Sequence, residues 1–267
     1  MAEQLIYRRP EDYDLEHEGD DADVAFHLAL VERSQPRRVL ELACGSGRVT
    51  FPLAELGARV GFDVVGLEPS APMREEAERR RAELPPRVRE HVQIVDGDMR
   101  SWHAVEPFDL IVTPCGSITH LLSRDDRLAT WRAARANLTP SGAFAIDVPM
   151  PDLAAYTDSL RTPARAVVEI DSDTQDDEGR RLLRSKTTEY DAVTQRARIR
   201  FVYDRFERER HTDRFVSDFE SHVYHPEELR LLYLHCGFVV DAEYGDYRFR
   251  PPRVRSRTLV MVGRLAE

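Results

Sequence analysis

The feature that most constrains the fold is a regular alternation of short apolar segments with longer amphipathic ones between residues 38 and 149. Strands that alternate with helices predict an α/β fold, a parallel sheet covered by helices on both faces. The pattern returns near the end of the sequence, after a different kind of segment. The expected strands are 38–43, 63–68, 91–96, 108–114, 142–149, 238–244 and 256–265, and the expected helices are 48–57 (closed by Gly57), 70–84, 124–138 and 225–238.

Residues 165–224 lose the helical period and alternate polar with apolar or β-branched residues. This pattern predicts three antiparallel strands, inserted after strand five and joined by turns near Gly179 and Asp191. The acidic segment 171–179 is expected to be a solvated loop. The resulting division is an N-terminal arm and helix (1–37, with the helix near 21–34), an α/β core (38–150), an antiparallel β insertion serving as lid or dimerisation element (151–224) and the rest of the core (225–267).

Composition narrows the classes of partner. The chain has 267 residues and a formal net charge of −10, which disfavours general nucleic-acid binding because phosphates are neutralised by clustered positive charge. Cys44, Cys115 and Cys236 form no CxxC pair, so neither a metal site nor a disulfide framework is expected. Without an apolar leader or a run of 18 apolar residues, a cytoplasmic protein that does not bind a membrane is expected. A small-molecule substrate is expected because the acidic balance disfavours nucleic acid and a lid would enclose the acceptor.

The segment ELACGSG places Gly45 and Gly47 where the first strand ends and the first helix begins. Glycines at that point allow tight turns and let a ligand lie against the backbone. A dinucleotide fingerprint requires a third glycine, where this chain has Thr50. Glu41, just before the loop, would repel a phosphate and attract a cationic amino group. The loop therefore favours a ligand with an ammonium group and no phosphate.

Acidic residues also follow the next two strands. Glu68 ends the second strand, where a carboxylate can accept hydrogen bonds from both ribose hydroxyls. Asp98 follows the third strand, where it can accept from an adenine amino group while the backbone of Met99 meets the ring. Together with Glu41, these acids fit an uncharged nucleoside that carries an amino-acid tail.

Four segments, LELACGSGRVTFPLA, VVGLEPS, VDGDMRSW and FDLIVTPCGSITHL, resemble the class I S-adenosylmethionine-dependent methyltransferases. The resemblance covers about 36–150 and resumes at 225–267. It implies a Rossmann-like seven-stranded sheet whose last strand is antiparallel, with S-adenosylmethionine as cofactor. It places the methionine part at Glu41, Gly45 and Gly47, the ribose at Glu68, and the adenine at Asp98 and Met99. Ala43, Pro69 and Pro114 complete the expected cofactor-binding residues.

The insertion, the HPEEL segment after it and the SITHL segment after strand four resemble a branch of small-molecule methyltransferases. That branch methylates amino groups of sugars and of antibiotic precursors. By this resemblance Tyr13, in a Tyr-Asp pair of the arm, reaches over the methyl donor, and His120 faces the acceptor. An unperturbed pKa near 6.5 makes His120 the candidate catalytic base, with a purely positioning role left open. Candidate lid residues are Tyr203, Arg205, Phe206 and His222.

The expected function is S-adenosylmethionine-dependent methylation of an amine or hydroxyl of a small metabolite, in natural-product metabolism such as antibiotic biosynthesis. Two alternatives remain open from the residues. One is an NAD-dependent oxidoreductase, which Thr50 disfavours, and the other is a non-catalytic methyltransferase-like binding domain. The insertion also leaves a homodimer open.

Overall fold

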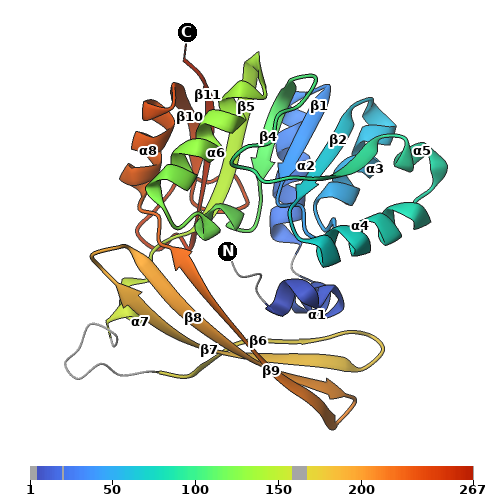
Figure 1. Cartoon of the computed structure of the whole chain (residues 1–267), viewed down its shortest axis with the longest axis vertical. Coiled ribbons are helices and arrows are strands. Elements are labelled where there is room, and N and C mark those ends of the chain that lie inside the picture. Colours follow the sequence, from blue (N-terminus) through green and yellow to red (C-terminus); the bar gives the residue numbers. More distant parts are fainter. Residues whose placement is uncertain (1–4, 20, 158–166, 267) are drawn as a thin grey trace. The chain divides into compact units, whose positions relative to one another are not determined.

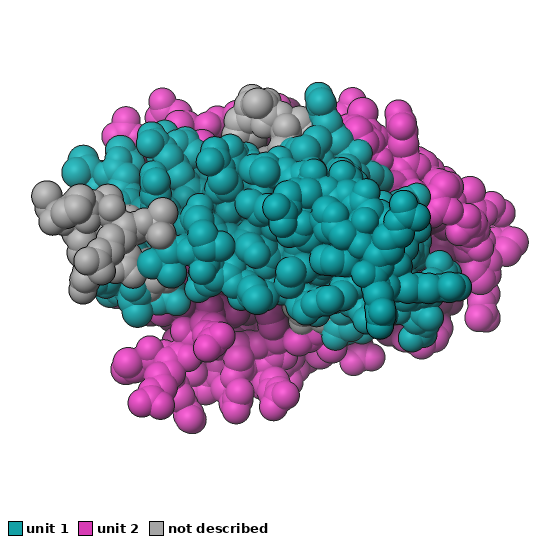
Figure 2. All heavy atoms as spheres, turned by 90° about the horizontal axis from the view of Figure 1, so that it is seen from below, with its two compact units in different colours: residues 1–21, 152–223 teal, residues 22–151, 224–267 magenta. Residues whose placement is uncertain are grey.

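The computed structural model describes residues 5–19, 21–157 and 167–266. The chain divides into two compact units, coloured separately in Figure 2. Unit 1 combines residues 1–21 with 152–223, and unit 2 combines 22–151 with 224–267. This division differs from the expected one, because the helix beginning at Ala22 belongs with the α/β core while the arm before it belongs with the insertion.

Unit 2 contains a seven-stranded sheet in the order β10-β11-β5-β4-β1-β2-β3 (Figure 1). The pairs from β5 through β4, β1 and β2 to β3 are all parallel, and β11 is antiparallel to both β5 and β10. The predicted fold class, a seven-stranded sheet with its last strand antiparallel, is confirmed. The strands are β1 Arg38–Leu42, β2 Asp63–Glu68, β3 Val92–Asp96, β4 Phe108–Thr113, β5 Leu138–Pro149, β10 Phe238–Tyr244 and β11 Thr258–Leu265.

Two apolar clusters cover the two faces of this sheet, because successive side chains of a strand point to opposite faces. Trp131 and Tyr233 belong to one cluster, and Phe26 and Phe51 belong to the other. No helix in the described part of the chain is long and apolar enough to cross a membrane. The helical segments of unit 2 are α2 Ala22–Ser34, α3 Thr50–Val60, α4 Ala71–Glu83, α5 Pro86–Arg89, η2 Ser117–His120, α6 Arg124–Ala136 and α8 Pro226–His235.

The end of α3 differs from the prediction. The helix continues past Gly57 to Val60, and Gly61 caps it with a φ of +92°. Glycine is needed at position 57 for a different reason, since a Cβ there would lie 2.4 Å from the carbonyl oxygen of Phe62. Gly57 thus lets the helix approach the chain that leads into β2.

Unit 1 contains a four-stranded antiparallel sheet in the order β6-β7-β8-β9, so the predicted antiparallel insertion is confirmed but has four strands rather than three. The acidic segment expected to be a loop supplies most of β6. Its carboxylates pair with basic side chains of β7, as Asp171 does with Lys186 at 2.6 Å and Asp173 with Arg181 at 2.6 Å. The strands are β6 Glu169–Gln175, β7 Arg180–Asp191, β8 Arg196–Glu207 and β9 Arg210–His222.

The N-terminal arm is helical in its described part, and it packs on this second sheet. It forms η1 Leu5–Arg8 and α1 Pro10–Glu16, while α7 Leu153–Tyr156 precedes the sheet in the sequence. Tyr203, proposed as a lid residue, is 1% exposed, and its ring stacks on Phe215 with 4.6 Å between centroids. Its hydroxyl donates to Glu16 at 3.0 Å. Tyr203 therefore belongs to the core of unit 1.

Candidate active site

The predicted cofactor residues gather at one edge of the seven-stranded sheet, where parallel strands have their carboxyl ends. β1 leads into the glycine loop, and β2, β3 and β4 lead into the segments that begin at Pro69, Gly97 and Pro114. In open α/β sheets this edge is where ligands bind. The topology therefore places every expected cofactor residue at or just before this edge.

The glycine loop between β1 and α3 turns through three positive φ angles, +57° at Ala43, +58° at Gly45 and +92° at Gly47. A Cβ at Gly47 would lie 2.2 Å from the ring of Phe51, so this glycine is required by packing as well as by its backbone. No side chain caps the start of α3. In the first turn, the N–H of Phe51 donates to the carbonyl of Gly47 at 3.0 Å and Pro52 has no N–H, so neither residue offers a donor to a ligand.

Glu68 ties the end of β2 to the glycine loop. One carboxylate oxygen accepts the N–H of Gly45 at 2.9 Å, and the other accepts the N–H of Ser70 at 2.8 Å. The side chain is buried, and each carboxylate oxygen can accept more than one hydrogen bond. Glu68 is thus held in a fixed orientation while it keeps acceptor capacity for two ligand hydroxyls.

Glu41 lies deeper than the sequence suggested. It is 2% exposed, and its carboxyl accepts the hydroxyl hydrogen bond of Thr50 at 2.5 Å. Burial raises the pKa of Glu41 to about 8, although the Thr50 hydrogen bond acts to lower it. Thr50 stands where a dinucleotide fingerprint has its third glycine, and in the structure its hydroxyl fastens α3 to β1. Direct contact between Glu41 and a cationic ligand stays a prediction.

Asp98 is paired with a residue that the sequence analysis did not consider. Arg100 donates to it through Nε at 2.9 Å and also reaches Asp126, at the start of α6, at 2.7 Å. The Arg100 hydrogen bonds hold the pKa of Asp98 below its ordinary value. Met99 packs at the border of the cluster that contains Trp131. The expected adenine contacts of Asp98 and Met99 stay predictions.

The segment after β4 carries the candidate catalytic residue His120. Ser117 donates to the carbonyl of Pro114 at 2.8 Å, and the hydroxyl of Tyr224 donates to the carbonyl of Ile118 at 3.0 Å. These bonds fix the short helix η2, which ends at His120. Burial lowers the pKa of the His120 imidazole to about 4, so its ring is neutral at pH 7.

A polar cluster that the sequence analysis missed joins three elements at this edge. Arg48 of the glycine loop donates to Asp23 at the start of α2 at 2.9 Å, and Cys115 after β4 donates to the same carboxylate at 3.0 Å. Burial alone would raise the pKa of Asp23, but the Arg48 interaction lowers it below its ordinary value. The positive charge of Arg48 is therefore already matched.

A second buried cluster lies beside it, around Asp147 near the end of β5. Asp147 is 1% exposed and accepts the Tyr247 hydroxyl at 2.7 Å. Its other oxygen lies 4.0 Å from Nε2 of His27, and neither atom has a hydrogen-bond partner among the described residues. Burial raises the pKa of Asp147 to about 7. A carboxylate inside an otherwise apolar strand was the signal that could have revealed this cluster.

Tyr13 lies on α1 in unit 1, with its ring 6.0 Å from that of Tyr7 and 4.5 Å from that of His17. It borders the apolar cluster that contains Tyr203. These contacts are local to unit 1. The role of Tyr13 over a methyl donor therefore stays a prediction.

Comparison with known proteins connects this edge to a family. Residues 39–142 match the family model described as a methyltransferase domain. The chain is 31% identical over 121 residues to YqeM of Bacillus subtilis, covering 44% of this chain and 45% of that protein. It is 30% identical over 127 residues to the dTDP-4-amino-2,3,4,6-tetradeoxy-D-glucose N,N-dimethyltransferase of Saccharopolyspora spinosa, covering 48% and 46%. The aligned segment thus spans less than half of either relative.

Solved structures resemble the chain over more of its length. CcbJ methyltransferase from Streptomyces caelestis has a TM-score of 0.73 and 22% identity, covering 92% of this chain and 90% of its own. CalS10, an S-adenosylmethionine-bound amino pentose methyltransferase from Micromonospora echinaspora, has a TM-score of 0.66 and 21% identity, covering 92% and 90%. The fold indicated by the sequence motifs is confirmed, the methyltransferase-domain model matches residues 39–142, and the expected cofactor is the one bound in CalS10.

Proposed function

We infer that this chain, whose residues 39–142 match the model of a methyltransferase domain, is an S-adenosylmethionine-dependent methyltransferase of small metabolites. The proposed acceptor is an amine, or alternatively a hydroxyl, of a compound in natural-product metabolism. Two similar proteins support the amine, because one is named for an amino-sugar nucleotide and the other for an amino pentose.

The observation that carries this proposal is the arrangement of Glu68 against the glycine loop. A buried carboxylate, held by the N–H groups of Gly45 and Ser70, suits the two hydroxyls of a ribose. The positive end of the α3 dipole, which lies at the glycine loop, favours the carboxylate of an amino-acid tail. The charge of Arg48 is matched by Asp23, and Thr50 replaces the third glycine of a dinucleotide fingerprint, so a pyrophosphate fits poorly. The residues present fit S-adenosylmethionine better than a dinucleotide.

S-adenosylmethionine, when bound, supplies an electrophilic methyl group. The chain must then hold a neutral amine in line with that group. The imidazole of His120, with a pKa of about 4, is neutral at pH 7 and can accept a hydrogen bond from an amine N–H. This pKa makes the ring a weak base. We therefore assign His120 the positioning of the acceptor rather than the removal of its proton.

Other parts of the proposal rest on the sequence resemblance. They are the placement of Tyr13 over the methyl donor, the use of unit 1 as lid or dimer interface, and a cytoplasmic location. The direct contacts of Ala43, Pro69 and Pro114 with the cofactor belong with them. Each of these is open to separate tests by substitution or by measurement of oligomeric state.

The test of cofactor use is isothermal titration with S-adenosylmethionine, S-adenosylhomocysteine and NAD. We expect micromolar binding of the first two and none of NAD. Glu68→Ala should weaken S-adenosylhomocysteine binding at least tenfold, since two hydrogen bonds to a charged group contribute about 1.5–3 kcal/mol each. Glu55→Ala, which removes an exposed acid of α3, is the matched control. NAD binding without S-adenosylmethionine binding would reject the proposal.

The test of acceptor chemistry is a panel of paired amines and alcohols, with methylated products followed by mass spectrometry. Turnover of an amine but not of its hydroxyl analogue would support the nitrogen acceptor. The reverse preference would move the proposal to oxygen. Cofactor binding without turnover across both sets would favour a non-catalytic binding domain.

A further inference from the structure

Two buried polar side chains of α2 attach this helix to elements that border the cofactor site. Asp23 and His27 are four residues apart, so they lie one turn apart on the same side of the helix. The carboxylate of Asp23 accepts Arg48 of the glycine loop at 2.9 Å. The imidazole of His27 lies against Asp147 of β5. The position of α2 is therefore linked both to the glycine loop and to the sheet.

The hydrogen bond of His27 to its own helix decides which ring nitrogen carries a proton. Nδ1 lies 2.8 Å from the backbone carbonyl oxygen of Asp23, and a carbonyl oxygen can only accept. Nδ1 therefore donates, and Nε2 of the neutral ring keeps a lone pair that needs a donor. This nitrogen is buried and has no hydrogen-bond partner among the described residues. Oδ1 of Asp147, 4.0 Å away, has none in the described part of the chain either.

A single proton on Asp147 satisfies both of these atoms. Oδ2 already accepts the Tyr247 hydroxyl at 2.7 Å, so a proton on Oδ1 leaves that bond intact. After a short movement of either side chain, the protonated oxygen can donate to Nε2 of His27. An ionised Asp147 would instead place a buried charge opposite a lone pair. Burial raises the pKa of Asp147 to about 7 and lowers that of His27, which favours the form with one proton between them. We call these two side chains the buried pair.

Charged and titratable groups on four elements face the buried pair. Asp23 of α2 raises the pKa of both members, and Arg48 of the glycine loop lowers it. The Tyr247 hydroxyl and the backbone N–H of Gly116, which follows β4, lower the pKa of the carboxyl member. The thiol of Cys115 stays neutral at pH 7, because desolvation of its sulfur raises its pKa well above the ordinary value. Since Asp23 and Arg48 neutralise each other, the buried pair is the part of this cluster that titrates near pH 7.

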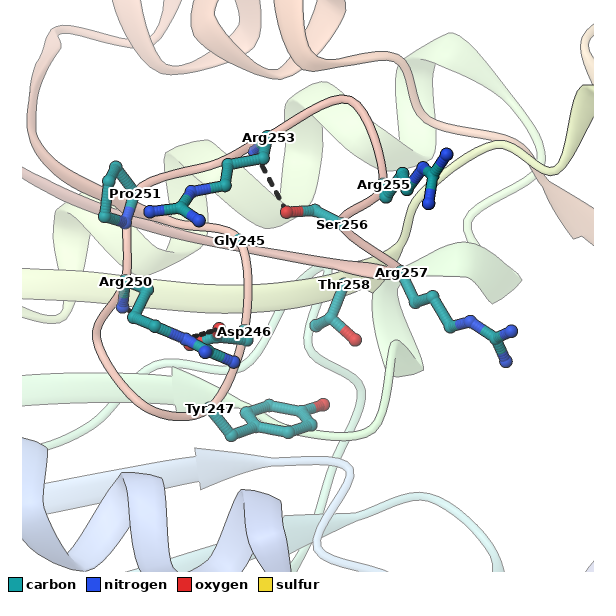
Figure 3. Close-up of a pocket in the computed structure, with 10 residues that line it drawn as sticks. All are labelled: Gly245, Asp246, Tyr247, Arg250, Pro251, Arg253, Arg255, Ser256, Arg257 and Thr258. Carbon is teal, nitrogen blue, oxygen red and sulfur yellow. Dashed lines mark hydrogen bonds and ion pairs between the residues drawn. The ribbon is translucent and has the colours of Figure 1, made fainter.

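Tyr247 gives the buried pair a short route to solvent. It belongs to the loop between β10 and β11, residues 245–257, and lines a cavity of about 340 Å³ in that loop. Figure 3 shows its ring at one side of the loop, with the hydroxyl directed away from the ion pair of Asp246 and Arg250. The same hydroxyl donates to Asp147. Proton exchange with solvent therefore does not require the sheet to open.

We propose that His27 and Asp147 are positioning residues for cofactor binding, and that one proton shared between them fixes α2 against the glycine loop. They act through Asp23 rather than by contact with the cofactor. The carboxylate of Asp23 holds Arg48 of the glycine loop, and it also accepts the thiol of Cys115, after β4, at 3.0 Å. Release of the shared proton to solvent removes the attachment of α2 to β5, and Asp23 then holds the loop less firmly. This inference rests on the proposed function for the identity of the cofactor.

The proton and the cofactor should therefore bind cooperatively. If the protonated buried pair binds S-adenosylhomocysteine fivefold more tightly than the deprotonated one, binding raises the pKa of the pair by about 0.7. From a starting pKa of about 7, the protein then takes up about 0.4 of a proton at pH 7.4. Isothermal titration of the wild-type chain in buffers of different ionisation enthalpy measures this uptake. Binding without proton uptake would overturn the inference.

Asp147→Asn separates the buried pair from other titrating groups. Its amide N–H can donate to His27 and its carbonyl can accept from Tyr247, so the variant copies the protonated pair at every pH. The ratio of wild-type to variant dissociation constants for S-adenosylhomocysteine should rise about fourfold from pH 6 to pH 8.5. Glu41, with a pKa of about 8, and the amino group of the ligand titrate in both proteins and cancel in this ratio. Asp241→Asn, the same change at an exposed carboxylate of β10, should keep the wild-type pH profile.

The outcomes separate a positioning role from a merely structural one. Binding by Asp147→Asn within twofold of wild type at pH 6 shows that the variant is folded. A constant ratio of dissociation constants across the pH range would overturn the inference, as would equal proton uptake by the two proteins. If the variant does not fold, the proton uptake of the wild-type chain decides alone. Failure of S-adenosylhomocysteine to bind the wild type at pH 6 would reject the proposed function as well, whereas binding without uptake rejects only the shared proton.

Discussion

Replacement of Asp147 by Asn offers a direct measure of the free energy stored in the buried cluster near the end of β5. The pKa of Asp147 is raised from 3.8 to about 7, mainly by burial. Between these pH values the folded chain keeps a proton that the unfolded chain has released. The free energy of unfolding therefore falls as pH rises through this range and reaches its full loss above about pH 7.

The size of the effect follows from the pKa shift. One pKa unit corresponds to 1.36 kcal/mol, so the whole shift amounts to roughly 4 kcal/mol, of which nearly 3 kcal/mol falls between pH 5 and pH 8. Asn resembles the protonated carboxyl, can still accept from Tyr247, and does not titrate. We therefore expect the variant to gain stability relative to wild type as pH rises, by about 3 kcal/mol over that interval.

The assay is urea unfolding at pH 5 and pH 8, followed by tryptophan fluorescence, because Trp131 is buried in unit 2. The pKa of buried His27 is lowered, which makes stability change with pH in the opposite sense. Because His27 lies 4.0 Å from Asp147 and would respond to the substitution, both proteins are compared in a His27→Gln background. Asp241→Asn, which removes an exposed ion pair with Arg264, is the control. The free energy of unfolding of this control should differ from that of wild type by the same amount at pH 5 and at pH 8. Equal differences between Asp147→Asn and wild type at both pH values would refute the reasoning.

Three other perturbations test the candidate site. Gly47 and Gly61 both have a φ of +92°, but only a Cβ at position 47 would meet an aromatic ring, at 2.2 Å. We therefore expect Gly47→Ala to lower the melting temperature several degrees more than Gly61→Ala does. Equal losses would show that backbone strain alone matters. Thr50→Val should lower the free energy of unfolding in urea by about 1–3 kcal/mol, because it removes the hydrogen-bond donor to Glu41. Thr50→Ser keeps a hydroxyl donor and should largely retain that free energy. His120→Asn should lower kcat at least tenfold with little change in cofactor binding, and the wild-type rate should show no His120 ionisation between pH 6 and pH 8; an inflection near pH 6.5 that Asn removes would restore the base assignment.

Apolar periodicity predicted the α/β core well, because buried parallel strands are nearly continuous apolar runs. The ranges 63–68 and 238–244 coincide with β2 and β10. Glycines at the end of β1 and the acid at the end of β2 likewise indicated the edge where the site lies. These signals are local, so a single sequence displays them.

What the sequence did not reveal depends on partners far away in the chain. β6 looks like a loop because its acids have no apolar pattern, but its backbone pairs with β7, where Arg181, Arg184 and Lys186 match those acids. Pairing of Arg48 with Asp23 likewise joins segments that share no local motif. Long-range charge matching of this kind leaves no periodic trace. The true cap of α3, Gly61, was missed because Gly57 occurs one turn earlier.

The position of β11 has a consequence for how the protein is made. This strand follows every other strand in the sequence, yet it lies between β5 and β10 and is paired along both of its edges. While a ribosome is still synthesising the chain, the β5 edge therefore has unpaired N–H and C=O groups and no neighbour on that side. Growing chains that stall before Thr258 would expose this edge to one another, so aggregation should concentrate in nascent or truncated forms rather than in the finished protein.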